Sequence, residues 1–187
     1  LVIDESKARA GEICAGLALA GYQVAAILAG ADNLTAEVEK LQPDVILIDT
    51  DSPSRDTLEN LAAMNKDMPR PVVIFTQEAG QETIRDAVKA GVSAYIVDGL
   101  DPKRIKPIVE VARARFEDTQ ALRRELDEIS QKLSDRKLVD KAKGVLMKAR
   151  GLDEDAAYHA MRKLAMERGQ SMAKVARDVI DMARVLL

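Results

Sequence analysis

The first hundred residues alternate short apolar runs with longer amphipathic segments. The apolar runs, predicted to be strands, cover residues 1–3, 23–28, 44–49, 71–76 and 93–97. Between them, apolar residues recur every three or four positions and predict helices over residues 7–20, 33–41, 55–66 and 81–90. Strands alternating with helices are typical of crossover connections, so the sequence predicts an α/β fold with a doubly wound five-stranded parallel sheet. Because the first strand begins at residue 1, we expect a few residues upstream of it.

A long helix is predicted after the last strand. Beyond Pro107 neither proline nor glycine occurs until Gly144, so one helix of about 65 Å, at 1.5 Å per residue, is predicted to reach Arg150. Apolar or small residues follow it at steps of three and four, as in a two-stranded coiled coil, from Ile105 through Ile108, Ala112, Phe116 and Thr119 to Leu133. The start of this stripe must pack on the sheet. From Leu122 onward we predict dimerisation; packing back on the sheet is the alternative. The predicted dimer contacts are Leu122, Leu126, Ile129 and Leu133.

The C-terminal end is predicted to form a small three-helix domain. Gly151 and Gly169 end helices, and Asp153 and Ser171 are good N-caps for helices over 154–168 and 172–186. Gly144, in mid-helix, costs about 1 kcal/mol against alanine, and we interpret it as a close contact between helices. The residues predicted to face inward are Ala157, Met161, Leu164, Ala165, Val175, Val179 and Met182. The predicted organisation is a sheet domain (1–106), a coiled-coil linker helix (107–134) and the helical domain (135–187).

Charge is distributed unevenly along the chain. Of 28 Lys and Arg and 31 Asp and Glu, 15 basic and 11 acidic residues lie from Ala121 onward, which leaves 13 basic and 20 acidic residues before it. A basic part of a chain suggests contact with an anion, although a solvated lysine face has the same pattern. The candidate anion-binding residues are Lys141, Lys143, Lys148, Arg150, Arg162, Lys163, Arg168, Lys174 and Arg177.

Composition narrows the class of protein. Hydrophobic residues make up 47% and charged residues 32%, and no apolar run is long enough to cross a membrane, so we expect a soluble, cytoplasmic protein without a membrane partner. One cysteine, Cys14, excludes an internal disulfide and a cysteine-rich zinc site. Aromatic residues are only 3%, which disfavours base stacking on an aromatic sheet surface.

Carboxylates gather at the carboxyl ends of the predicted strands. Asp4 and Glu5 end the first strand, Asp49 ends the third, and Asp51 lies just beyond. Like charges that converge on one crevice are unfavourable without a cation, and hard oxygen ligands suit Mg²⁺. The sequence therefore predicts a crevice that could hold Mg²⁺. It contains no histidine or lysine base, so we do not expect an enzyme.

Residues 1 to about 120 resemble the CheY-like receiver domain of bacterial response regulators. Asp49-Thr-Asp-Ser-Pro53 is similar to the phosphoacceptor motif of that family, and Asp4 and Glu5 to its metal-binding acid pair. The resemblance implies that Asp49 accepts phosphate as a carboxylate nucleophile. It also implies switch roles for the Thr76 hydroxyl and the Tyr95 ring.

One position departs from the receiver pattern. Asp98-Gly99 stands where the family has Lys-Pro, and the family lysine contacts the phosphoryl group. An anion in that place disfavours a developing phosphate. We therefore expect an input other than phosphorylation, with a phosphorylation-switched response regulator as the alternative.

The C-terminal part resembles the ANTAR domain, the RNA-binding module of bacterial transcription antiterminators. The resemblance rests on Ala142-Lys-Gly-Val-Leu-Met147 and on GLDEDAAYHAMRKLAMERGQSMAKVARDVI over 151–180. It implies RNA stem-loops, often paired hairpins, as the target. Together with Asp98, the segments SPSRDTLENL and YIVDGLDP resemble the receiver-plus-ANTAR subgroup that regulates nitrate assimilation, which implies a nitrate- or nitrite-sensing partner protein.

Three function classes remain. In the first, a homodimer presents two RNA-binding modules to adjacent hairpins of a leader transcript and excludes the terminator, gaining affinity through effective concentration. In the second, the helical domain is a protein-interaction adaptor with a solvated basic face. DNA binding is the least favoured, because no helix-turn-helix spacing is evident in the last 65 residues.

Overall fold

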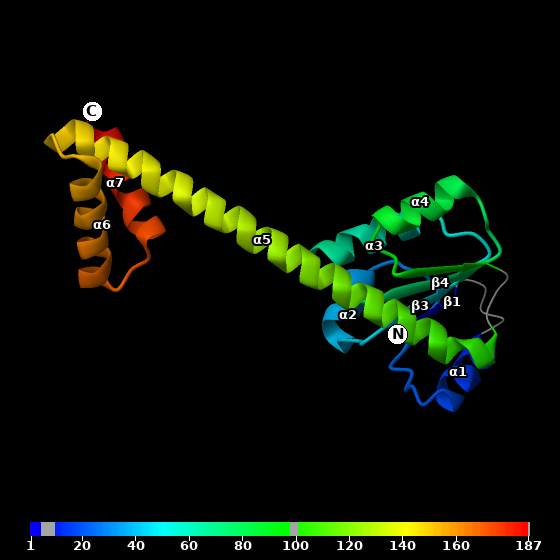
Figure 1. Cartoon of the computed structure of the whole chain (residues 1–187). Helices are drawn as coiled ribbons and strands as arrows, with labels where there is room; N and C mark the ends of the chain where they lie inside the picture. Colours follow the sequence, from blue (N-terminus) through cyan, green and yellow to red (C-terminus); the bar gives the residue numbers. More distant parts are fainter. Residues whose placement is uncertain (5–9, 98–100, 187) are drawn as a thin grey trace. The chain divides into compact units, whose positions relative to one another are not determined.

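The computed structural model describes residues 1–4, 10–97 and 101–186 (Figure 1). The chain divides into two compact units, Leu1–Gln120 and Ala121–Leu187. In the part of the chain described, no helix is both long and apolar enough to span a membrane.

A five-stranded parallel sheet forms the centre of the first unit. The strands are β1 (Val2–Asp4), β2 (Ile27–Leu28), β3 (Ile46–Asp49), β4 (Val72–Thr76) and β5 (Ala94–Val97), in the order β2-β1-β3-β4-β5. This arrangement confirms the predicted doubly wound α/β fold. The strand predicted over 23–28 is shorter than expected, because β2 lies at the edge of the sheet and pairs only with β1, through Ile27 and Leu28.

Helices cover both faces of the sheet (Figure 1). On one face lie α2 (Leu34–Leu41), α3 (Arg55–Asp67) and α4 (Gln81–Lys89); on the other lie α1 (Ala10–Leu19) and the start of α5 (Ile105–Arg150). Successive residues of a strand point to opposite faces, so Ile46 and Ile48 join the first core and Leu47 the second. A 3₁₀ turn (Pro102–Arg104) precedes α5, which is one continuous helix, as predicted. The predicted start of the first helix, at residue 7, lies outside the described residues.

Three helical segments build the second unit: the C-terminal part of α5, α6 (Glu154–Arg168) and α7 (Met172–Leu186). The predicted caps are present, because Asp153 Oδ1 accepts from the Ala156 N–H at 2.7 Å and Ser171 Oγ accepts from the Lys174 N–H at 3.2 Å. The buried core consists of Ala142, Met161, Ala165, Val175, Ala176 and Ile180.

Two predictions about this unit are wrong. Met182, expected to face inward, is 65% exposed, because it lies at the edge of the face of α7 that carries Val175, Ala176 and Ile180. Gly144, interpreted as a close contact between helices, has open space around it, since a Cβ built at this position meets no atom within 4 Å.

Candidate functional site

Two carboxylates lie side by side at the carboxyl end of the sheet. Asp4 and Asp49 are register partners in the parallel pair β1 and β3, and each side chain is only 1% exposed. Neighbouring strands are about 4.8 Å apart, so the two aspartates lie next to each other at the same edge of the sheet. The local sequence explains the placement, because each aspartate ends an apolar strand whose other residues fill the sheet core.

A hydrogen-bonded path connects the loops beside these carboxylates. Thr76, 1% exposed at the end of β4, donates its hydroxyl to the carbonyl oxygen of Asp51 at 2.9 Å. The Glu78 N–H donates to the same hydroxyl at 3.1 Å, and the Tyr95 hydroxyl donates to the Glu78 carbonyl at 3.0 Å. Burial raises the pKa of Tyr95 above its usual range. The two predicted switch residues are thus joined to each other and to the loop that follows Asp49.

The predicted metal ligands are only partly visible. Asp51 is exposed, in contrast to Asp4 and Asp49. The predicted ligand Glu5 lies outside the described residues, as does Asp98, the residue that departs from the receiver pattern. Among the residues that are described, no three His, Cys, Asp or Glu side chains are grouped so as to hold a metal ion. The Mg²⁺ site therefore stays a prediction.

The nine predicted anion-binding residues divide into two sets. Four form ion pairs inside the second unit: Lys143 with Asp140 and Glu154, Lys163 with Glu167 at 3.9 Å, Lys174 with Asp178 at 2.7 Å, and Arg177 with Asp135 at 4.0 Å. The other five have exposed side chains, and the structure records no ion pair for them among the residues it describes. These five, here called the open cations, are Lys141, Lys148, Arg150, Arg162 and Arg168.

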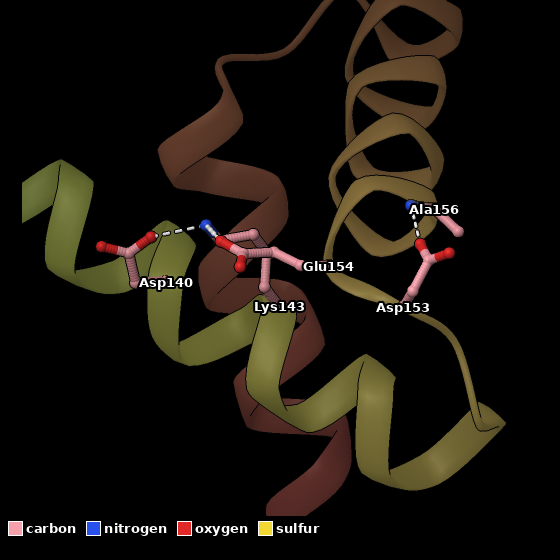
Figure 2. Close-up of polar contacts among 5 residues, drawn as sticks. All are labelled: Asp140, Lys143, Asp153, Glu154 and Ala156. Atoms are coloured by element: carbon pink, nitrogen blue, oxygen red, sulfur yellow. Dashed lines mark hydrogen bonds and ion pairs between the residues drawn. The ribbon is translucent and has the colours of Figure 1, made fainter.

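Lys143 joins two helices and is not the exposed cation that was predicted (Figure 2). Its Nζ lies 2.7 Å from Asp140 Oδ1 on α5 and 2.7 Å from Glu154 Oε1 at the start of α6, and the side chain is 15% exposed. The two carboxylates raise the pKa of Lys143, and the hydrogen bond from Lys143 lowers the pKa of Asp140. The prediction of Lys143 as an exposed anion-binding residue is therefore corrected: its charge is already matched within the unit.

Sequence reasoning missed part of this surface. Glu154 was not singled out, although it holds Lys143, and its eleven-residue separation from Lys143 gave no local signal. Lys137 was also left out of the predicted set, although it is exposed and one turn before Lys141. The spacing of four residues between these lysines was the available signal.

The apolar stripe of the middle of α5 is exposed in the single chain. The side chains of the four predicted dimer contacts are all more than half exposed; they are Leu122, Leu126, Ile129 and Leu133. By contrast, the earlier members Ile105 and Ala112 are fully buried in the sheet domain. The stripe is thus buried at the start of α5 and exposed in the middle of the same helix.

Comparisons with known proteins match both units. Residues 1–110 match the response regulator receiver domain, and residues 127–180 match the ANTAR domain. The transcriptional regulatory protein PdtaR of Mycobacterium tuberculosis (strain ATCC 25618 / H37Rv) is 29% identical over 161 residues, which cover 86% of this chain and 78% of PdtaR. The nitrate regulatory protein of Klebsiella oxytoca is 36% identical over 75 residues, which cover 40% of this chain and 19% of that protein.

A solved structure shows the same fold as the first unit. The CheY-like receiver domain protein of Methanospirillum hungatei JF-1 matches with a TM-score of 0.54 at 24% identity, over 63% of this chain and 94% of that chain.

Proposed function

Because this chain belongs to the response regulator receiver family and carries an ANTAR domain, which makes it a response regulator of the antiterminator type, we propose that it binds leader-RNA stem-loops and prevents transcription termination. RNA hairpins offer phosphates and unpaired loop bases to a protein surface. The ANTAR unit would provide the RNA-binding surface, and the receiver unit would control it.

The observation that carries this proposal is the set of open cations on the ANTAR unit. Arg and Lys contacts to phosphate supply most of the non-specific affinity of a nucleic-acid-binding protein and position it on the target. Lys148 and Arg162 come from different helices of one compact unit, so the charge belongs to a folded surface and not to a flexible tail. The alternative, a basic face that is only solvated, explains neither the folded surface nor the match to the ANTAR domain.

We also propose a homodimer formed through the apolar stripe of α5. Leu122, Leu126, Ile129 and Leu133 lie at alternating steps of four and three, which is the spacing of a two-stranded coiled coil. Four large apolar side chains, each more than half exposed, would be buried in such a pair. Two ANTAR units held together gain affinity for paired hairpins through effective concentration.

The input to the receiver is proposed to be a partner protein rather than phosphate. In the sequence, Asp98 stands at the position where the resemblance to receivers implies a phosphate-contacting lysine, and an anion in that role would disfavour phosphorylation of Asp49. The similarity to the Klebsiella oxytoca nitrate regulatory protein supports nitrate or nitrite as the signal, sensed by that partner. Nitrate assimilation genes are therefore the proposed target of regulation.

A Mg²⁺ ion fits the chemistry of the receiver crevice. Asp4 and Asp49 provide adjacent carboxylate oxygens, which are hard ligands, and Glu5 and Asp51 are the further proposed ligands. A bound cation would offset the repulsion between the carboxylates. Addition of Mg²⁺ should then raise the melting midpoint of the receiver unit, and an unchanged midpoint would refute the site.

The test of the main proposal is a binding titration with three nucleic acids across a salt series. The purified protein is titrated with a two-hairpin leader RNA, the matching DNA and an RNA with scrambled loops. Tight binding to the intact RNA alone is expected, with a logarithmic salt slope of about −0.7 to −0.9 per phosphate contacted. Equal weak binding to all three would mean that the basic surface is only solvated and would favour the adaptor alternative.

Charge reversal locates the surface. Lys148→Glu and Arg162→Glu should each weaken RNA binding and lower the salt slope by about one contact. Lys66→Glu, the same charge change at an exposed position of α3 in the receiver, is the matched control and should leave affinity nearly unchanged. Equal effects of all three variants would indicate a non-specific effect of net charge.

A further inference from the structure

Gly144 has no role that the fold explains. It lies in the middle of α5, and glycine is the poorest helix former after proline. Its backbone is not in the left-handed region; among the described residues, the glycines with positive φ are Gly21, Gly91, Gly151 and Gly169. A Cβ at this position would meet no atom within 4 Å, so packing within the chain does not require glycine either.

The neighbours of Gly144 are lysines. Lys137, Lys141, Gly144 and Lys148 follow one another at steps of four, three and four, which places them on one face of the helix, here called the Gly144 stripe. All three lysines are exposed, and among the residues described by the structure none of them has an ion pair. Between Lys141 and Lys148 the helix rises about 10 Å, at 1.5 Å per residue.

Asp140, the acidic residue of α5 one turn before Gly144, is paired with another cation. Asp140 precedes Gly144 by four residues and is the only acidic residue between Arg136 and Arg150. Its carboxylate accepts from Lys143 Nζ at 2.7 Å, and Lys143 is also bound to Glu154 (Figure 2). The negative charge next to the stripe is thus largely matched before any ligand arrives.

We propose that the Gly144 stripe is the place where the sugar-phosphate backbone of the RNA lies directly against the main chain of α5, with Lys141 and Lys148 binding phosphates on either side. A glycine without Cβ lets another backbone approach closely, which accounts for a residue that is otherwise unfavourable here. This inference rests on the proposed RNA-binding function and names the surface that the RNA occupies. A second copy of the chain would fit this surface less well, because its lysines would repel the lysines of the Gly144 stripe.

The test is Gly144→Ala, which separates stability from binding. Alanine is the better helix former, and the added methyl group enters open space, so the melting midpoint of the C-terminal unit should rise by roughly 4–8 °C. Affinity for the two-hairpin RNA should fall at least about tenfold, because the methyl group separates the two backbones and moves the phosphates away from the lysines. Gly144→Val should lower the affinity further. Gln131→Ala, an exposed position of α5 off the stripe, is the control and should bind normally.

The outcomes can be distinguished. If the wild type binds the RNA and Gly144→Ala binds it equally tightly, this inference is overturned and the proposed function stands. Loss of dimers by Gly144→Ala, measured by sedimentation, would also overturn it, since a second copy would then occupy the stripe. Absence of RNA binding by the wild type would remove the proposed function and this inference with it. Lys141→Gln, which keeps the helix intact, should reproduce the loss of affinity and lower the salt slope.

Discussion

The exposed stripe of α5 leads to a quantitative prediction about assembly. Leu126 and Leu133 are 65% and 54% exposed in the single chain. Full burial of a leucine contributes about 1.5–3 kcal/mol, so burying the exposed half should contribute roughly 1–1.5 kcal/mol per side chain. Two leucines in each of two chains then contribute about 4–6 kcal/mol to the dimer. Replacing both by aspartate should therefore raise the dimer dissociation constant by at least about 10³-fold to 10⁴-fold.

The measurement is sedimentation equilibrium over a concentration series, with far-ultraviolet circular dichroism as a check of folding. Because both leucines are already exposed, the Leu126→Asp/Leu133→Asp variant should keep the helix content of the wild type. Gln131→Asp/Ser134→Asp adds the same two charges at exposed positions off the stripe, and it should remain dimeric. A wild type that is monomeric at high concentration, or a leucine double variant that dimerises like the wild type, would refute the reasoning.

Three further predictions concern single residues. Acetyl phosphate should not change the RNA affinity of the wild type, and Asp49→Asn should bind RNA and be regulated nearly as the wild type is; a wild-type response to acetyl phosphate that Asp49→Asn loses would restore the phosphorylation model. Met161→Ala should destabilise the C-terminal unit by about 2–5 kcal/mol in denaturant unfolding, because the side chain is fully buried there, and an unchanged transition would contradict the assigned core. Lys143→Met should lower the free energy of unfolding mainly between pH 3.8 and pH 10.5, which are the ordinary pKa values of Asp140 and Lys143. The lowered pKa of Asp140 gives stability that is lost as the pH falls through it, and the raised pKa of Lys143 gives stability that is lost as the pH rises through it, so melting curves should converge outside that range.

The sheet and its carboxylates were predictable because their signals are local. An apolar run followed by a carboxylate marks the end of a buried strand, and parallel strands bring such ends together, as Asp4 and Asp49 confirm. The length of β2 was not predictable in this way, since it depends on the single neighbour available at the sheet edge.

The C-terminal surface was less predictable because its charges interact across a turn. Nothing near Lys143 in the sequence indicates that Glu154, beyond the bend at Gly151, takes up its charge. The open space around Gly144 likewise depends on where α6 and α7 lie against α5. The sequence could predict where the cations lie, but it could not predict which of them are free of ion pairs within the unit and can bind an anion.

The short connections of the C-terminal unit have a consequence for the order of folding. Its three helical segments are consecutive in the chain and are joined by turns at Gly151 and Gly169. Contacts between consecutive helices have low sequence separation and form in microseconds to milliseconds, whereas the parallel strand pairs of the receiver must close longer loops first. The helical unit should therefore complete its fold soon after it leaves the ribosome. When the full chain refolds from denaturant, the slower phase should be the assembly of the sheet.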